Sequence, residues 1–128
     1  MYPHVDIISD DAEFIQLCRQ HLRPLKYACR FFSSDVDLEE LLTGRRPGDV
    51  VVIHRQIPND IAITIMDILK DNSPETKVVI VSDSDDFWND FRFWLADDCR
   101  VIRRDLAGLS CSLRHLIPPE INEESRLL

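Results

Sequence analysis

The stretch VVVIHRQIP, residues 50–58, decides the fold of this chain. Its first four residues, Val50–Ile53, are all β-branched, and an unbroken run of this kind is typical of a strand buried on both faces of a parallel sheet. Lys77–Val81 contains a second such run, and a helical pattern at Ile61–Lys70 separates the two. A strand, a helix and a further buried strand form the repeating unit of a parallel sheet that helices cover.

The same alternation extends in both directions along the chain. The other predicted strands are Val5–Ile8, Tyr27–Phe32 and Arg100–Ile102, and the other predicted helices are Ala12–Leu22, Asp35–Thr43, Phe87–Leu95 and Leu106–Ile117. A strand followed by a helix therefore occurs five times. The sequence predicts an α/β fold, a doubly wound parallel sheet of five strands in one domain.

Length and composition indicate one domain. The chain has 128 residues, which is enough for one hydrophobic core and too few for two. We expect the domain to cover residues 1–117 and a polar, acidic tail or linker to cover residues 118–128, beginning at Pro118–Pro119. The chain has neither a run of roughly 18 apolar residues nor a signal-peptide pattern. We therefore expect a cytoplasmic location and no membrane contact.

The charge balance opposes direct binding to nucleic acid. The chain carries 15 basic and 23 acidic residues, a net charge of -8. Such a chain is repelled by a phosphate backbone unless its basic residues cluster. The local cluster of Arg100, Arg103 and Arg104 is interrupted by two apolar residues and followed by Asp105. The sequence predicts no direct contact of this domain with nucleic acid.

No catalytic motif is visible. The four cysteines, at positions 18, 29, 99 and 111, lack the spacing of a zinc site, and we expect them to be small buried apolar residues. The chain has no glycine-rich phosphate loop and no evident pair of nucleophile and base. We predict that the protein is not an enzyme and needs no cofactor.

In an open sheet of this kind, ligands bind beyond the carboxyl ends of the strands, where the strand order reverses. Several polar residues follow the predicted strands directly: Ser9, Asp10, Asp11, His54, Ser82, Asp83 and Arg103. Carboxylates, a hydroxyl and a cation that converge at one edge suit a site for magnesium and phosphate.

In order and spacing, these residues resemble the receiver domains of bacterial response regulators, typified by the single-domain chemotaxis regulator. The resemblance covers about residues 4–117. An acidic pair closes the first strand of that family, and Asp10–Asp11 matches it. Ser82 matches the hydroxyl residue that closes the fourth strand, and Pro58 matches the proline four residues after the phosphate acceptor. The resemblance implies the strand order 2-1-3-4-5 and a role in two-component signalling.

One departure from the family removes its chemistry. His54 stands where the family has the aspartate that accepts the phosphoryl group. An imidazole cannot form the acyl phosphate, and its presence removes one carboxylate from the metal site. Magnesium prefers oxygen ligands, so we expect no bound metal. This departure indicates a degenerate receiver, or pseudo-receiver, with Asp10 and Asp11 as remnants of the metal pocket.

Three arginines mark further departures. Arg103 replaces the lysine that closes the fifth strand, and its planar group fits a carboxylate, so we expect it to pair with Asp10 or Asp11. Arg104 takes the place of the usual proline. Arg100 takes the place of the aromatic residue that links the pocket to the binding face in the family.

These features support two hypotheses on function. The first is a signalling module that binds a protein partner or forms a homodimer without phosphorylation, such as the regulatory domain of a bacterial two-component transcription regulator. By the resemblance, the contact face combines residues 87–95, 100–102 and 106–117, with Phe93, Arg100 and Arg104 as candidate interface residues. The alternative is a regulatory domain that binds a small molecule or an anion through Ser82 and Arg103.

Some residues have more than one interpretation. Asp10 and Asp11 either cap the first helix or retain a metal role. His54 either bonds a neighbouring acid or, with both aspartates, binds zinc. The excess of apolar residues in helix 61–70 indicates either deep burial or a second interface. In helix 87–95 Phe93 points away from the predicted core-facing residues, which are Phe87, Trp88, Phe91, Trp94 and Leu95.

Overall fold

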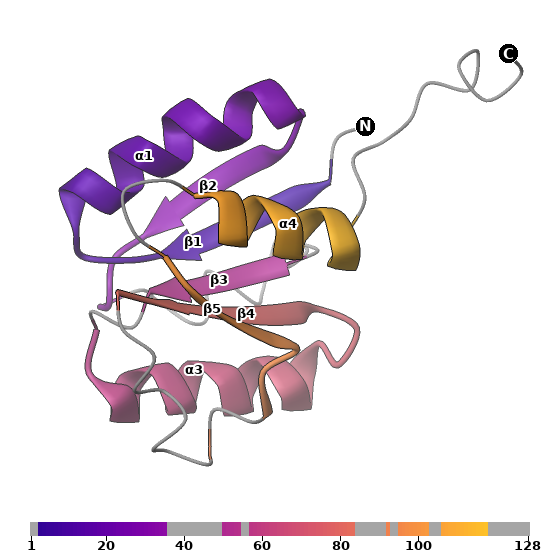
Figure 1. The fold of residues 1–128 in the computed structure, drawn as a ribbon. Coiled ribbons are helices and arrows are strands. Elements are labelled where there is room, and N and C mark those ends of the chain that lie inside the picture. The colour runs from indigo at the N-terminus through magenta and orange to yellow at the C-terminus, as the bar shows by residue number, and fades with distance from the viewer. Residues whose placement is uncertain are drawn as a thin grey trace, which may run out of the picture.

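Five parallel strands form one sheet in the order β2-β1-β3-β4-β5 (Figure 1). The computed structural model describes residues 3–35, 50–54, 57–83, 92, 95–102 and 106–117. The strands are β1 (His4–Ile8), β2 (Ala28–Phe32), β3 (Val50–His54), β4 (Lys77–Ser82) and β5 (Asp98–Val101). The predicted fold and strand order are confirmed. The order reverses between β1 and β3, so the carboxyl ends of these two strands flank the position where such sheets bind ligands.

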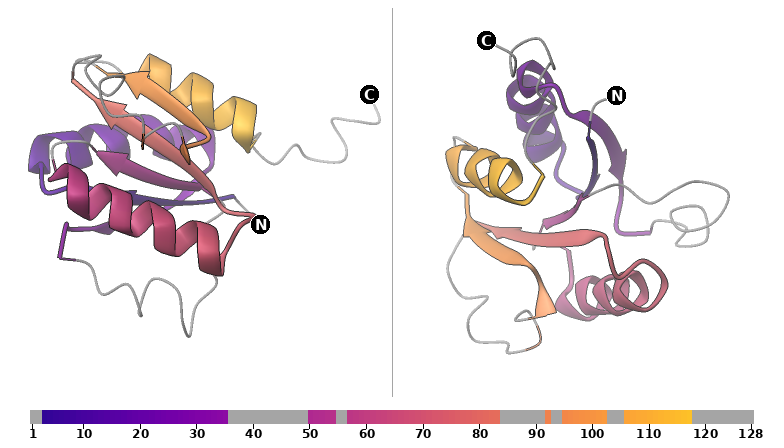
Figure 2. Two further views of the ribbon diagram at one scale, coloured as in Figure 1. Left: turned by 90° about the horizontal axis from the view of Figure 1, so that it is seen from below. Right: turned by 90° about the vertical axis from the view of Figure 1, so that its right-hand side faces the viewer.

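Helices cover both faces of the sheet. They are α1 (Ala12–Leu22), the short 3-10 helix η1 (Arg23–Leu25), α3 (Asn59–Asn72) and α4 (Ala107–Leu116). Figure 2 shows α3 on one side of the sheet and α1 with α4 on the other. No helix among the described residues is long and apolar enough to span a membrane.

The side chains of the central strands alternate between two hydrophobic clusters. Val50 and Val52 join the cluster beneath α1 and α4, whereas Val51 and Ile53 join the cluster beneath α3. All four residues of the run Val50–Ile53 are fully buried, as an unbroken β-branched run predicts. Apolar side chains therefore pack against both faces of the sheet.

The apolar excess of α3 is mostly explained by burial. Ile63, Ile65, Met66 and Leu69 are buried against the sheet, which confirms deep burial for this part of the helix. Ile61 is exposed instead. The helix extends beyond its predicted bounds at both ends, because Pro58 precedes its first turn and the helical pattern continues to Asn72.

Three predictions about individual residues are wrong. Strand β5 begins at Asp98, two residues before the predicted start, because the carboxylate of Asp98 accepts hydrogen bonds from its own strand and from α4. Leu95 was expected in the core, but it lies just outside the sheet and is 56% exposed. Cys111 lies on the outer side of α4 and is exposed, while Cys29 and Cys99 are only partly buried. The expected helices at 35–43 and 87–95, and the tail, lie outside the described residues apart from Asp35, Arg92 and Leu95.

Candidate functional site

A cavity of about 480 Å³ opens at the carboxyl edge of the sheet, beside the first turns of α1. Side chains from α1 and from the ends of β3, β4 and β5 border it. The described residues that line it are Asp11, Glu13, Phe14, Leu17, His54, Asp83 and Ile102. The sequence placed Asp11, His54 and Asp83 at this edge but did not single out the other four residues.

His54 is the last residue of β3, and the surrounding elements enclose its ring. Only 2% of its surface is exposed. The ring of Phe14, from the first turn of α1, stacks on the imidazole with 4.1 Å between ring centroids and 25° between planes. The Oγ of Ser9 lies 2.8 Å from Nδ1. His54 is therefore fixed by one stacking contact and one hydrogen bond.

Ser9 connects the end of β1 to both His54 and α1. Its backbone N–H donates to the carbonyl of Phe32, and its Oγ accepts a bond of 3.0 Å from the backbone N–H of Asp11. Because a hydroxyl can donate and accept, Ser9 can bond either tautomer of His54. The sequence predicted a neighbouring acid as the partner of His54, and the partner is this serine instead. In the sequence, the position of Ser9 directly after β1 was the feature that could have indicated this contact.

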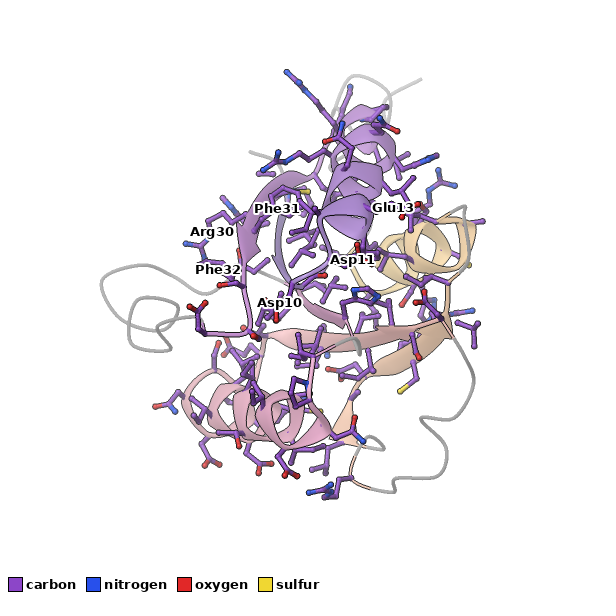
Figure 3. All side chains as sticks on the ribbon, turned by 90° about the vertical axis from the view of Figure 1, so that its left-hand side faces the viewer. Asp10, Asp11, Glu13, Arg30, Phe31 and Phe32 are labelled. Carbon is purple, nitrogen blue, oxygen red and sulfur yellow. The ribbon has the colours of Figure 1, made fainter. Side chains whose placement is uncertain are left out.

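The two aspartates after β1 point in different directions (Figure 3). Asp11 caps α1, since its Oδ1 accepts hydrogen bonds from the backbone N–H groups of Glu13 and Phe14. Asp10 instead accepts a bond of 2.7 Å from the backbone N–H of Ser34. The side chain and backbone of Ser34 hold the pKa of Asp10 below its ordinary value. Of the acidic pair, Asp11 borders the cavity and Asp10 does not.

The other predicted site residues do not join this group. Ser82 is buried at the end of β4, where its carbonyl accepts a bond from the backbone N–H of Ile102, and it does not line the cavity. Arg100 lies on β5, where its Nε donates to Asp98 at 2.8 Å. Arg103, Arg104 and Phe93 lie outside the described residues, and with them the expected pairing of Arg103.

The described residues do not fit a metal ion. They contain no group of three histidine, cysteine, aspartate or glutamate side chains that could hold one. His54 takes the place of a carboxylate, and Asp10 is bonded to Ser34 away from the cavity. This arrangement fits neither the oxygen-rich shell of magnesium nor the zinc site considered from the sequence.

The enclosure of His54 makes the stability of the fold sensitive to acid. Burial lowers the pKa of His54, while the nearby carboxylates of Asp83 and Asp11 act in the opposite direction without reversing the shift. Between the lowered pKa and the unfolded value of about 6.5, only the unfolded chain binds the proton. Neutral His54 therefore favours the folded state above this range, and that contribution is lost as the pH falls through it.

We expect the free energy of unfolding to decrease as the pH falls below about 6.5, by at most about 1.4 kcal/mol per pH unit from this group. Urea unfolding between pH 5 and 8 measures the effect. His54→Asn is the matched control, since it keeps a polar side chain without a titrating group. Parallel pH profiles of the two proteins contradict this assignment.

Comparison with known proteins adds the class of the fold. No protein family model and no curated protein sequence matches the chain. Solved structures do match it. The response regulator TrrA of Thermotoga maritima is 15% identical, over 90% of this chain and 99% of TrrA, with a TM-score of 0.78. The chemotaxis response regulator CheY4 of Vibrio cholerae is 12% identical, over 91% of this chain and all of its own, with a TM-score of 0.77.

A receiver domain from Clostridium thermocellum is 18% identical, over 98% of this chain and 99% of its own, with a TM-score of 0.74. These similarities establish the fold. The chain has the CheY-like fold of response regulator receiver domains, with the strand order expected from the resemblance.

Proposed function

We propose that this chain is a receiver-type signalling domain that does not accept a phosphoryl group and acts by binding a protein partner. The observation that carries the proposal is the environment of His54. At the end of β3, where a receiver has its acceptor aspartate, this chain has an imidazole stacked on Phe14 and bonded to Ser9. Such a group offers neither a carboxylate for the phosphoryl group nor an oxygen ligand for magnesium.

Binding is favoured over catalysis by the state of Ser9 and of three of the four cysteines. Ser9 is 1% exposed and does not line the cavity, so its hydroxyl is not accessible to a substrate despite its bond to His54. Burial raises the pKa of the Cys18 thiol to about 12 and the pKa of Cys29 and Cys99 to about 11. These thiols are protonated at neutral pH and are poor nucleophiles.

The proposed contact face consists of residues 87–95, β5 and α4. TrrA has been solved with magnesium and beryllofluoride and also with the histidine kinase ThkA. For this chain we propose that it binds a protein partner without binding magnesium or accepting a phosphoryl group. The partner is a histidine kinase, another regulator or a second copy. Leu95 and Val101 supply exposed apolar surface on this face.

A hydrogen-bonded network supports a rigid contact face. The Oδ2 of Asp98 accepts bonds from Arg100 Nε at 2.8 Å and from the buried Ser112 hydroxyl of α4 at 2.7 Å. Its Oδ1 accepts from the backbone N–H of Cys99. Burial acts to raise the pKa of Asp98, but these bonds outweigh it and the pKa is lowered. The charged carboxylate therefore joins β5 to α4.

We expect no phosphoryl transfer to this chain from acetyl phosphate or from a partner kinase. The physical reason is the absence of a carboxylate at position 54. Intact-mass measurement after incubation tests this, with an ordinary receiver treated in parallel to verify that the donor is active. A stable phosphoryl adduct on any aspartate of the chain contradicts the proposal.

The contact face is tested by two substitutions at equally exposed apolar residues. Val101 on the edge strand β5 and Ile61 on α3 are each 37% exposed, and only Val101 belongs to the proposed contact face. We expect Val101→Lys to weaken self-association or kinase binding by about tenfold or more. Ile61→Lys is expected to leave binding within about twofold, which is well under 1 kcal/mol. Sedimentation and binding titrations measure both, and equal losses in the two variants contradict this choice of face.

A further inference from the structure

The cavity beside α1 has one acidic side and one apolar side. Carboxylates come from Asp11, Glu13 and Asp83, and apolar surface comes from Phe14, Leu17 and Ile102. Among its described lining residues there is no lysine or arginine. Its volume of about 480 Å³ is in the range of sites that hold small organic ligands. This charge opposes the anion that the sequence suggested as an alternative ligand.

A second observation comes from the buried imidazole. The Nδ1 of His54 is bonded to Ser9, and no described residue forms a hydrogen bond with Nε2. Within the described part of the chain, no fully enclosed side-chain nitrogen or oxygen lacks a partner. Since His54 lines the cavity, Nε2 therefore faces into it. With the proton on Nδ1, Nε2 offers a lone pair to a donor in the cavity.

The shape of the acidic side distinguishes between kinds of cation. The described side chains do not converge closely enough to hold a metal ion. Glu13 and Asp83 are exposed at the rim and come from α1 and from the end of β4, so their charges are spread over the opening. The matching ligand has a positive group with several N–H donors and an apolar part that reaches Phe14 and Leu17.

We propose that this cavity binds an organic cation, an ammonium or guanidinium group carried on an apolar stem. The charged group lies among Asp11, Glu13 and Asp83 and donates to Nε2 of His54, and the stem lies on Phe14 and Leu17. The same chemistry is present in a small amine and in a lysine or arginine side chain of a protein. The site is separate from the contact face on β5 and does not depend on the function proposed above.

The test uses the full chain and n-butylguanidinium as the probe. Backbone amide and imidazole NMR signals are followed during titration at constant ionic strength. We expect saturable shifts at Ser9, Phe14 and His54. The double variant Glu13→Gln/Asp83→Asn is expected to weaken binding by about tenfold. Glu75→Gln, which removes an exposed carboxylate outside the cavity, is expected to change it by less than about twofold.

Two further probes test whether binding needs both the positive charge and the apolar stem. Neutral n-butylurea and the bare guanidinium ion are each expected to bind at least about tenfold more weakly than the probe that combines both parts. Equal binding of n-butylurea, or an equal loss in Glu75→Gln, overturns the proposal. So does binding that is seen only in Arg103→Ala, because the cavity is then filled by the chain's own arginine.

A last comparison identifies the source of the cation. A blocked tripeptide with a central arginine is titrated beside n-butylguanidinium. Tighter binding of the peptide supports a protein side chain as the ligand, and tighter binding of the free cation supports a small molecule. Failure of every cation to bind overturns the proposal and leaves the function proposed for the contact face untouched.

Discussion

Replacing His54 with aspartate is expected to lower the free energy of unfolding by about 2–4 kcal/mol at pH 7. The new carboxylate would be buried where His54 is only 2% exposed, with Asp11 and Asp83 nearby. It also loses the stacking contact with Phe14. Burial and like charges raise the pKa of the introduced carboxyl above its unfolded value, so this penalty is removed as the pH falls through the raised pKa.

Urea unfolding of His54→Asp and His54→Asn at several pH values separates the part of the stability loss that comes from the charge from the part that comes from the changed shape of the side chain. His54→Asn is expected to lose less stability and to show no such recovery in acid. Magnesium at millimolar concentration is expected to restore part of the stability of His54→Asp and to leave the wild type unchanged, because a ligand stabilises only a protein that binds it. A clear magnesium effect on the wild type contradicts the absence of a metal site.

Replacing Phe14 with alanine is expected to cost about 3–5 kcal/mol, a typical loss for a buried aromatic residue. Phe14 is buried in the cluster beneath α1 and α4, and it also covers one face of the His54 ring. Its removal enlarges the cavity and admits water to the imidazole. The pKa of His54 is therefore expected to return toward its ordinary value.

NMR titration of the His54 ring and urea unfolding test both parts of this prediction. Phe14→Leu is the matched control, because leucine retains most of the apolar volume without the aromatic stack. It is expected to lose about 1–2 kcal/mol, in keeping with a partial loss of volume. A loss of stability in Phe14→Ala without any change in the pKa of His54 means that Phe14 supports the core but does not shield the imidazole.

The sequence predicted those elements whose patterns are local. Helix α1 has the predicted bounds, because its apolar stripe begins after a capping acid and ends near Pro24. The two β-branched runs gave β3 and β4 to within one residue. Short strand β5 has no such run, and its first residue is an aspartate that long-range bonds hold in place.

The site was harder to predict because its contacts join distant residues. Ser9 and His54 are 45 residues apart, and their bond follows from the pairing of β1 with β3. The contact of Asp6, a fully buried acid within β1, also depends on the pairing of two strands. Asp6 sits opposite Arg30 of β2, which binds both carboxylate oxygens at 2.8 Å. The sequence places each residue on a strand, but only the register shows which residues meet.

The bond between Ser9 and His54 also constrains how this site can change in evolution. Substituting Ser9 alone removes the hydrogen-bond partner of the buried Nδ1 of His54, at a cost of about 1–3 kcal/mol, and substituting His54 alone leaves the Ser9 hydroxyl with only the backbone N–H of Asp11. Because Ser9 also receives the backbone N–H of Asp11, its replacement disturbs the start of α1 as well. A lineage that replaced His54 with an acid would thus pass through less stable intermediates. The pair therefore favours a joint change at both positions over a change at either one alone.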